Sequence, residues 1–175
     1  MSTKSLVLMA LLVSTGAALY VVIPGFNGGM KPDFMLTMMF VGILLFPYAK
    51  HVFLLAATTG ILSGLFSTFP GGFLPNIVDK LITAFIFLLA VQLLKKYASR
   101  LPAVISLTAA GTLLSGTIFL SAAILLIGAE IPFLPLVLTV VLPAMVLNAI
   151  AIGFIYPIIM TLVKRSKFET AVSAA

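Results

Sequence analysis

The stretch FPGGFLPNIVDK, residues 69–80, separates two long apolar runs of the chain. Its first four residues, FPGG, cannot continue a helix, because proline lacks the backbone donor and glycine gives up helical order easily. Pro75 then suits the first turn of a new helix, where its missing N–H needs no partner. One face of that helix carries four polar side chains at i, i+3, i+4 and i+7: Asn76, Asp79, Lys80 and Thr83. The sequence therefore predicts a polar face inside an apolar helix.

The composition is that of a membrane protein. Of the 175 residues, 62% are hydrophobic and only 8% are charged, and the mean hydropathy is +1.31. Soluble proteins are roughly a quarter charged, so this deficit predicts a chain that lies in a lipid bilayer. The net charge is +6, but the basic residues stand at the ends of apolar runs, as membrane orientation requires, so no nucleic-acid partner is expected. The chain has no cysteine, which excludes disulfides and thiolate metal sites.

The chain has six apolar runs, and most of them approach the ~20 residues that are needed to cross the hydrocarbon of a bilayer. We therefore expect an all-α membrane protein with a single transmembrane domain over residues 1–175. Its six transmembrane helices are predicted at residues 6–23, 33–46, 52–68, 76–94, 102–127 and 136–163. The second is short, which suggests little tilt or a locally thinned bilayer. Pro143 and Pro157 are expected to break the last run. Cleavage of the first run as a signal peptide is not expected, because it would leave a less consistent charge pattern.

The distribution of charge predicts the orientation. With both termini cytoplasmic, the inner side collects most basic residues: Lys4, Lys50, Lys95, Lys96, Arg100, Lys164, Arg165 and Lys167. The outer side keeps only Lys31 and Lys80, beside Asp33, Asp79 and Glu130. This split follows the positive-inside rule of membrane proteins. It places three of the four acidic residues, with two lysines, on the outer side.

Several short stretches carry a resemblance to a known family, and they occur in the same order over nearly the whole chain. They are Met30-Lys31-Pro32-Asp33, GILLFP at residues 42–47, Pro75-Asn76 with Asp79-Lys80, Leu142-Pro143-Ala144 with Asn148, and Tyr156-Pro157-Ile158. Together they resemble the TrpP tryptophan transport protein family of Gram-positive bacteria. That family is similar to the substrate-binding (S) components of energy-coupling factor transporters.

The resemblance implies a six-helix binding protein of the cell membrane that captures L-tryptophan from outside. It also implies a separate transmembrane coupling subunit and two ATPase subunits as partners. The sequence itself has no GxxxxGK[ST] loop, so we do not expect this chain to hydrolyse ATP. GxSxG and HExxH motifs are absent, and the single histidine, His51, falls in a predicted cytoplasmic turn. We therefore expect no enzymatic activity, no cofactor and no metal.

An amino-acid zwitterion needs a cation, an anion and neutral polar groups within an apolar wall, because burying either charge unpaired is very costly. The candidates for substrate binding are Asn76, Asp79, Lys80, Lys31, Asp33 and Asn148. For the 76/79/80 face we favour ligand binding over pairing at the membrane interface. Lys31 and Asp33 could equally anchor the start of a helix, where an anion is favourable. Asn148 could contact the ligand or hydrogen-bond another helix.

Stripes of small residues let helices approach closely in lipid. Two of them predict packing within the protein: Gly60, Ser63, Gly64 and Ser67, and Thr108, Gly111, Thr112 and Ser115. A third lies on the first helix and consists of Ala10, Ser14 and Ala18. Similar stripes on the first helix of S components contact the coupling subunit, so the resemblance implies partner coupling here.

The aromatic lining of the site stays open, with four candidates on the predicted outer loops: Phe26, Phe69, Phe73 and Phe133. Two other functions also stay open. One is an S component for another aromatic amino acid or a vitamin, and the other is a membrane scaffold protein without a small ligand. A non-specific channel would need a continuous polar stripe through the spans, and the sequence has none.

Overall fold

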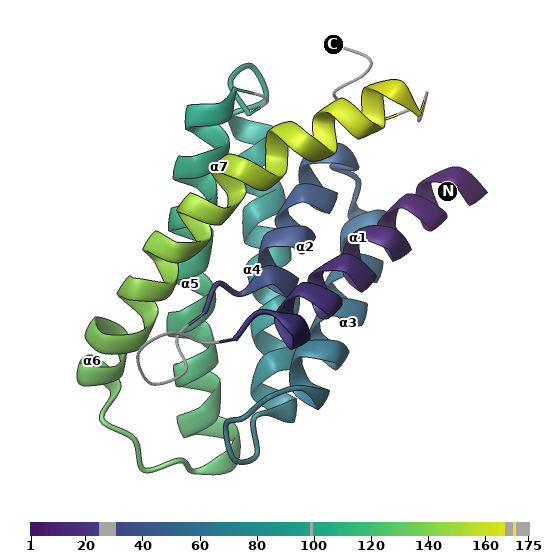
Figure 1. Ribbon diagram of the computed structural model, residues 1–175. Helices are drawn as coiled ribbons and strands as arrows, with labels where there is room; N and C mark the ends of the chain where they lie inside the picture. The colour runs from purple at the N-terminus through teal and green to yellow at the C-terminus, as the bar shows by residue number, and fades with distance from the viewer. Residues whose placement is uncertain (25–30, 99, 167–169, 171–175) are drawn as a thin grey trace.

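The computed structural model describes residues 1–24, 31–98, 100–166 and 170, and over these residues it contains helices and no strand (Figure 1). The elements are α1 (Thr3–Val22), α2 (Phe34–Leu45), α3 (Ala49–Leu65), α4 (Phe73–Leu93), α5 (Leu101–Ile127), α6 (Phe133–Leu136), the π-helical η1 (Val137–Val141) and α7 (Leu142–Arg165). The all-α class is confirmed. Because α6, η1 and α7 follow one another directly and form one helical segment, the six expected helical segments are confirmed as well. Phe26, Met30 and Lys167 lie outside the described residues.

The helices differ in whether they could cross a bilayer alone. In the described part of the chain, four helical segments are long and apolar enough: α1, α4, α5 and the combined segment Phe133–Arg165. The other two, α2 and α3, have 12 and 17 residues. At 1.5 Å per residue, α2 rises by only about 18 Å, well short of the ~30 Å of hydrocarbon.

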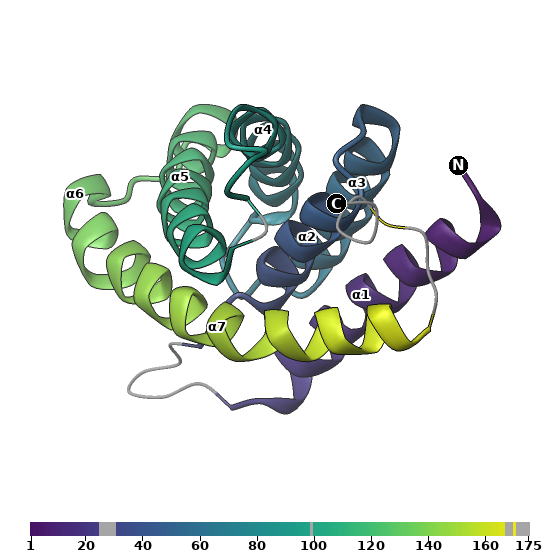
Figure 2. The ribbon, with the colours of Figure 1, turned by 90° about the horizontal axis from the view of Figure 1, so that it is seen from above.

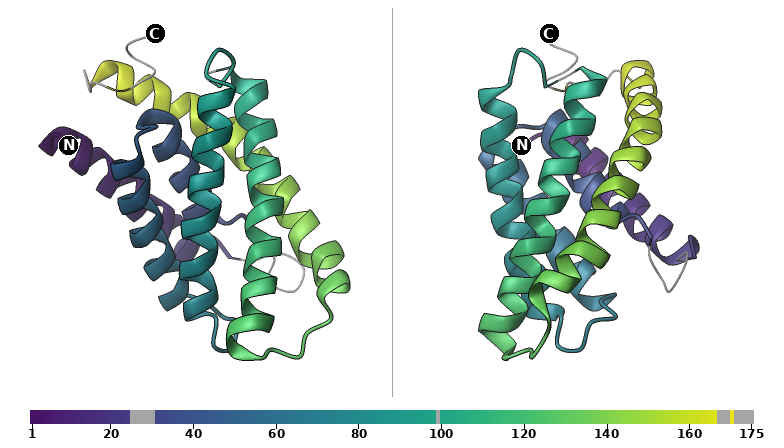
Figure 3. Two further views of the ribbon diagram at one scale, coloured as in Figure 1. Left: turned by 180° about the vertical axis from the view of Figure 1, so that it is seen from behind. Right: turned by 90° about the vertical axis from the view of Figure 1, so that its left-hand side faces the viewer.

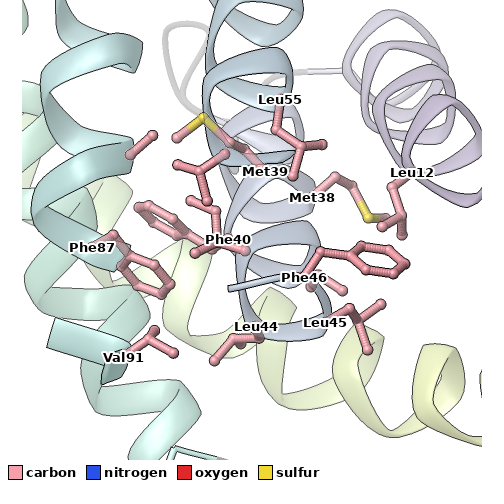
Figure 4. Close-up of a cluster of buried hydrophobic side chains, with 14 of the residues drawn as sticks. Leu12, Met38, Met39, Phe40, Leu44, Leu45, Phe46, Leu55, Phe87 and Val91 are labelled. Carbon is pink, nitrogen blue, oxygen red and sulfur yellow. The ribbon is translucent and has the colours of Figure 1, made fainter. Parts of the chain in front are cut away.

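The short helix α2 forms the core of the bundle. All of its residues are buried, and in Figure 2 it lies between α1 and α7 on one side and α3, α4 and α5 on the other. The Phe40 ring stacks on the Phe87 ring of α4, with centroids 4.1 Å apart (Figure 4). On the opposite side of α2, Met38 lies toward Leu12 of α1 (Figure 4). A helix that is apolar all round is typically buried, so α2 meets protein rather than lipid.

The surrounding helices expose large apolar side chains on their outward faces. Leu93 of α4, Leu125 of α5 and Phe154 of α7 are 85%, 80% and 72% exposed. Soluble proteins rarely present such continuous apolar surface to water. The exposed faces are therefore the lipid-facing surface of a multi-pass membrane protein.

The turn between α3 and α4 adopts the predicted break. Gly71 has φ +70°, which favours glycine, and α4 begins at Phe73, so that Pro75 lies in its first turn. The two helices then run side by side (Figure 3). A Cβ on Gly60 would lie 3.0 Å from the Cα of Ile77, and one on Gly64 would lie 3.0 Å from the Phe73 carbonyl oxygen. The packing predicted for these two glycines is confirmed.

Two local expectations are wrong. The last helical segment is not broken at its prolines: Pro143 follows the π-helical turn, where the Leu142 N–H donates to the Val137 carbonyl, and α7 continues through Pro157 to Arg165. Lipid offers the backbone no competing water, so a transmembrane helix can continue past a proline. His51 lies in the first turn of α3 rather than in a turn between helices, and its ring stacks on Phe46 at 5.4 Å.

Candidate functional site

The polar face of α4 points into the bundle. Its four polar residues are all buried, as the i, i+3, i+4, i+7 spacing predicts: Asn76, Asp79, Lys80 and Thr83 are between 0% and 8% exposed. Gly60 allows α3 to pack closely against α4 at this point, since a Cβ on Gly60 would lie 3.4 Å from the Lys80 Cβ. A buried lysine and a buried aspartate each need partners, because an unpaired charge in a low-dielectric interior is very unfavourable.

The buried charges are satisfied by one connected network. Lys80 Nζ lies 2.8 Å from Asp79 Oδ2 and 3.2 Å from Asp33 Oδ2. The Ser115 hydroxyl donates to Asp79 Oδ2 at 2.8 Å and accepts from Lys80 Nζ at 3.3 Å. The Thr83 hydroxyl donates to Asp79 Oδ1 at 2.9 Å. Both carboxylate oxygens of Asp79 are therefore occupied by protein donors.

Asp33 is the member of this network that is open to a ligand. Its side chain is 32% exposed, against 3% for Lys80 and 1% for Asp79. It also caps α2, because Oδ1 accepts from the Leu36 N–H at 2.9 Å. Asp33 thus serves both as the N-cap residue of the central helix and as the exposed end of an ion-pair network.

Asn148 holds the start of α2 in place through two hydrogen bonds. Its Oδ1 accepts from the backbone N–H of Asp33 at 2.7 Å, and its Nδ2 donates to the Thr112 hydroxyl at 3.1 Å. The side chain is fully buried. These two bonds connect α7, α5 and the start of α2. Of the two roles considered for Asn148, hydrogen bonding to other helices therefore accounts for its contacts.

Lys31 approaches the site from the segment before α2. Its Nζ donates to the Tyr20 carbonyl oxygen at 2.6 Å and lies 3.7 Å from the centroid of the Tyr20 ring. An ammonium over an aromatic face is attracted by the ring quadrupole. The last turn of α1 therefore holds the Lys31 ammonium group in place. Lys31 and Asp33 both line the cavity that is described next.

A cavity of about 390 Å³ joins these groups. Its charged and polar lining residues include Lys31, Asp33, Asn76, Asp79, Lys80, Thr112 and Ser115. The apolar and aromatic lining comes from Tyr20, Phe69, Phe119, Leu120, Leu136, Val140, Val141, Ala144 and Leu147. The Phe69 and Phe119 rings meet edge to face, with centroids 5.4 Å apart. Such a cavity suits a small molecule with one polar end and one large apolar end.

The structure brings together five of the six predicted site residues: Asn76, Asp79, Lys80, Lys31 and Asp33 all line the cavity. Asn148 does not line it. Of the aromatic candidates Phe69 lies on the lining, whereas Phe73 and Phe133 do not. Among residues 1–24, 31–98, 100–166 and 170, no three histidine, aspartate or glutamate side chains gather as metal ligands.

Among the lining residues that sequence reasoning missed are Tyr20, Ser115 and Phe119. Ser115 belongs to a stripe of small residues for which the sequence predicts only packing. Gly111 of that stripe does pack, since a Cβ there would meet the Phe40 ring at 2.7 Å. Ser115 shares α5 with several other serine and threonine residues, among them Thr108 and Thr112, so its hydroxyl alone does not single it out. Tyr20 and Phe119 carry no signal among so many apolar residues.

The third stripe of small residues faces away from the bundle. Ala10, Ser14 and Ala18 of α1 are exposed, whereas the opposite face of the helix buries Leu8, Met9, Leu12 and Val13. The stripe is therefore accessible from outside the protein.

Comparison with known proteins extends the resemblance noted in the sequence. A family model described as "Tryptophan transporter TrpP" matches residues 2–164. A "Probable tryptophan transport protein" of Bacillus subtilis (strain 168) is 50% identical over 171 residues, which are 98% of this chain and 99% of the relative. A protein of the same name from Clostridium acetobutylicum is 37% identical over 166 residues, 95% of each chain. No solved structure matches. The chain is thus a member of the TrpP tryptophan transporter family and a multi-pass protein of the cell membrane.

Proposed function

We propose that this chain is the substrate-binding membrane subunit of a tryptophan uptake system. The observation that carries the proposal is a cavity that is lined both by the Asp33–Lys80–Asp79 ion-pair network and by the Phe69–Phe119 pair of rings. Relatives that match nearly the whole chain bear the name tryptophan transport protein. Binding of L-tryptophan to the purified protein tests the proposal.

The balance of charge favours a zwitterion. The cavity lining holds two lysines and two aspartates, so the four groups sum to zero. A neutral zwitterion leaves that balance unchanged, whereas an anionic vitamin would add an uncompensated negative charge in a poorly solvated site. This argument supports an amino acid over a carboxylate vitamin.

The contacts suggest a division of roles among the site residues. In the proposed complex, Asp33 receives the ammonium group, because it is the exposed end of the network. Lys31 receives the carboxylate, with Lys80 as the second cation nearby. Asp79 and Lys80 hold the Asp33 carboxylate in place, and Asn148 holds its backbone.

The apolar side of the cavity would take the indole ring. The Phe69 and Phe119 rings meet edge to face, so the indole ring could pack against the edge of one ring and the face of the other. Aromatic rings prefer such edge-to-face contacts. The wall from Leu136 to Leu147 contributes only apolar side chains to the cavity. An indole ring there would be shielded from water and would gain from burial of its apolar surface.

The proposed orientation places both termini in the cytoplasm. In Figure 1 the turn from α3 to α4 and the connection from α5 to α6 lie at the opposite end from the end of α4 and the start of α5. The basic residues Lys95, Lys96 and Arg100 belong to the latter end, which the positive-inside rule assigns to the cytoplasm. The cavity, which includes residues of the α3–α4 turn, would then receive its ligand from outside.

Uptake by such a subunit would use energy from other proteins. We propose a transmembrane coupling subunit and two ATPase subunits as partners, as in energy-coupling factor transporters. The exposed stripe Ala10, Ser14 and Ala18 is the proposed contact with the coupling subunit. Small side chains let a partner helix approach the α1 backbone closely, which is the main source of helix association in lipid. The chain itself would be a transport subunit and not an enzyme.

A further inference from the structure

We propose that Asn76 recognises the indole N–H of the ligand by accepting a hydrogen bond from it through Oδ1. This inference rests on the proposed function, because it names the contact that distinguishes tryptophan from other aromatic amino acids in the same cavity. Asn76 is nearly buried and lines that cavity.

The orientation of the Asn76 amide is fixed by its own helix. Its Nδ2 donates to the Gly72 carbonyl oxygen at 2.7 Å. The reversed amide would place two acceptor oxygens at that distance, which is unfavourable. Nδ2 is therefore the bound end of the amide. Oδ1 has no hydrogen-bond donor among the described residues, and it is left as an acceptor for the cavity.

The position of Asn76 suits the ring end of the ligand. It lies four residues before Lys80 on the same face of α4, about 6 Å along the helix axis. A ligand with its charged end at Asp33, which lies beside Lys80, would therefore extend its ring one turn along α4, toward the end of the cavity that includes Phe69. The ammonium group is met better by the Asp33 carboxylate, whereas a neutral amide oxygen matches a neutral ring N–H.

The neighbouring hydroxyl groups are less suited to this role. The Ser67 oxygen already accepts from the Phe69 N–H at 3.3 Å. The Ser63 hydroxyl donates to the Met35 sulfur at 3.4 Å, so its oxygen can still accept a hydrogen bond. Thr68 lines the cavity but is exposed. Thr68 and Ser63 are therefore the alternative acceptors that a test has to separate from Asn76.

The test compares L-tryptophan with 1-methyl-L-tryptophan, which keeps the zwitterion and the ring but lacks the N–H donor. We expect the wild-type protein to bind tryptophan roughly tenfold or more tightly, because the analogue leaves the amide oxygen unpaired. Asn76→Ala removes the acceptor and makes room for the methyl group, so the two affinities should come within about threefold. The start of α4 should survive, since the Asn76 backbone N–H already donates to the Gly72 carbonyl at 3.1 Å.

Three further variants make the outcome decisive. Thr68→Val and Ser63→Ala should each keep the wild-type preference. Asn76→Ser removes the amide oxygen but keeps a hydroxyl that can donate to the Gly72 carbonyl. This variant should lose the preference for tryptophan, and it replaces Asn76→Ala in the test if the alanine variant does not fold. The inference would be overturned if the wild type bound both compounds equally, if the Asn76 variants kept the preference, or if Thr68→Val or Ser63→Ala lost it. Each of these results would leave the proposed function standing. Failure of the wild type to bind either compound would overturn the proposed function together with the inference.

Discussion

Lys80 Nζ lies 3.2 Å from Asp33 Oδ2, although the two residues are 47 positions apart in the chain. This ion pair joins the polar face of α4 to the N-cap residue of the central helix α2. It places one largely buried charge beside one that is open to the cavity. The proposed binding mode depends on this relationship, because the buried lysine orients the carboxylate that would meet the ligand.

Asp33→Asn tests the role of the exposed carboxylate. Asparagine is as good an N-cap residue as aspartate, so α2 should keep its start. Lys80 loses one ion pair but keeps Asp79 as its counter-charge, so the protein should stay folded with a small fall in melting temperature. The ammonium group of tryptophan would lose its counter-charge, and we expect the dissociation constant to rise tenfold or more. Calorimetric titration measures the affinity, and a melting curve measures the stability. Unchanged affinity in a folded Asp33→Asn protein would exclude Asp33 as the ammonium contact.

Lys80→Ala and Asp79→Asn test the buried pair. Removing one partner of a buried ion pair leaves the other uncompensated and can cost several kcal/mol, about 3–5 in known cases. Both variants should therefore melt at a lower temperature and, when folded, bind tryptophan at least about tenfold more weakly. Both measurements are needed, since these residues act largely through Asp33. Stable variants that bind within about twofold of the wild type would show that the two residues only anchor the helix.

Phe119→Leu tests the aromatic side of the cavity. Leucine keeps most of the apolar surface but removes the edge-to-face partner of Phe69. Because aromatic pairs add about 0.5–1.5 kcal/mol beyond burial, we expect tryptophan to bind roughly 2- to 12-fold more weakly. Phe154→Leu is the matched control, since Phe154 is exposed on the lipid-facing side of α7. Equal affinities of the two variants would place the indole ring away from Phe119.

Ala10→Leu and Ser14→Leu test the proposed coupling surface on α1. A leucine side chain would fill the space between small residues and hold a partner helix away from the α1 backbone. We expect normal tryptophan binding but loss of co-purification with the coupling subunit and loss of uptake. Ala110→Leu, on an exposed face of α5, should leave all three unchanged. Assembly of both α1 variants with the coupling subunit would remove this stripe from the interface, whereas joint loss of binding and assembly would indicate damage to the fold.

Local pattern is enough to predict most of the fold. The length of the apolar runs predicts the helices, and the 3.6-residue period of a helix by itself puts Asn76, Asp79 and Lys80 on one face. The break at Phe69–Gly72 follows from proline and glycine chemistry. These features depend on neighbours in sequence, so they can be read from the chain directly.

Long-range relationships cannot be predicted in the same way. Nothing local indicates that Asp33 pairs with Lys80, that Asn148 bonds the Asp33 backbone, or that the short α2 is the core of the bundle. Phe119 looks like any other apolar residue of a membrane helix. Each of these depends on which helices lie side by side, and an apolar helix without a polar face gives little information about its neighbours.

The central claim is that the cavity binds L-tryptophan, and the fluorescence of the ligand measures this most directly. The chain contains no tryptophan, so added L-tryptophan would be the only indole fluorophore in a detergent solution of the purified protein. Entry into the cavity should exclude water from the ring and shift its emission to the blue, saturably and with displacement by tryptophan analogues but not by unrelated vitamins. Absence of both an emission shift and a heat of binding at millimolar L-tryptophan would contradict the claim.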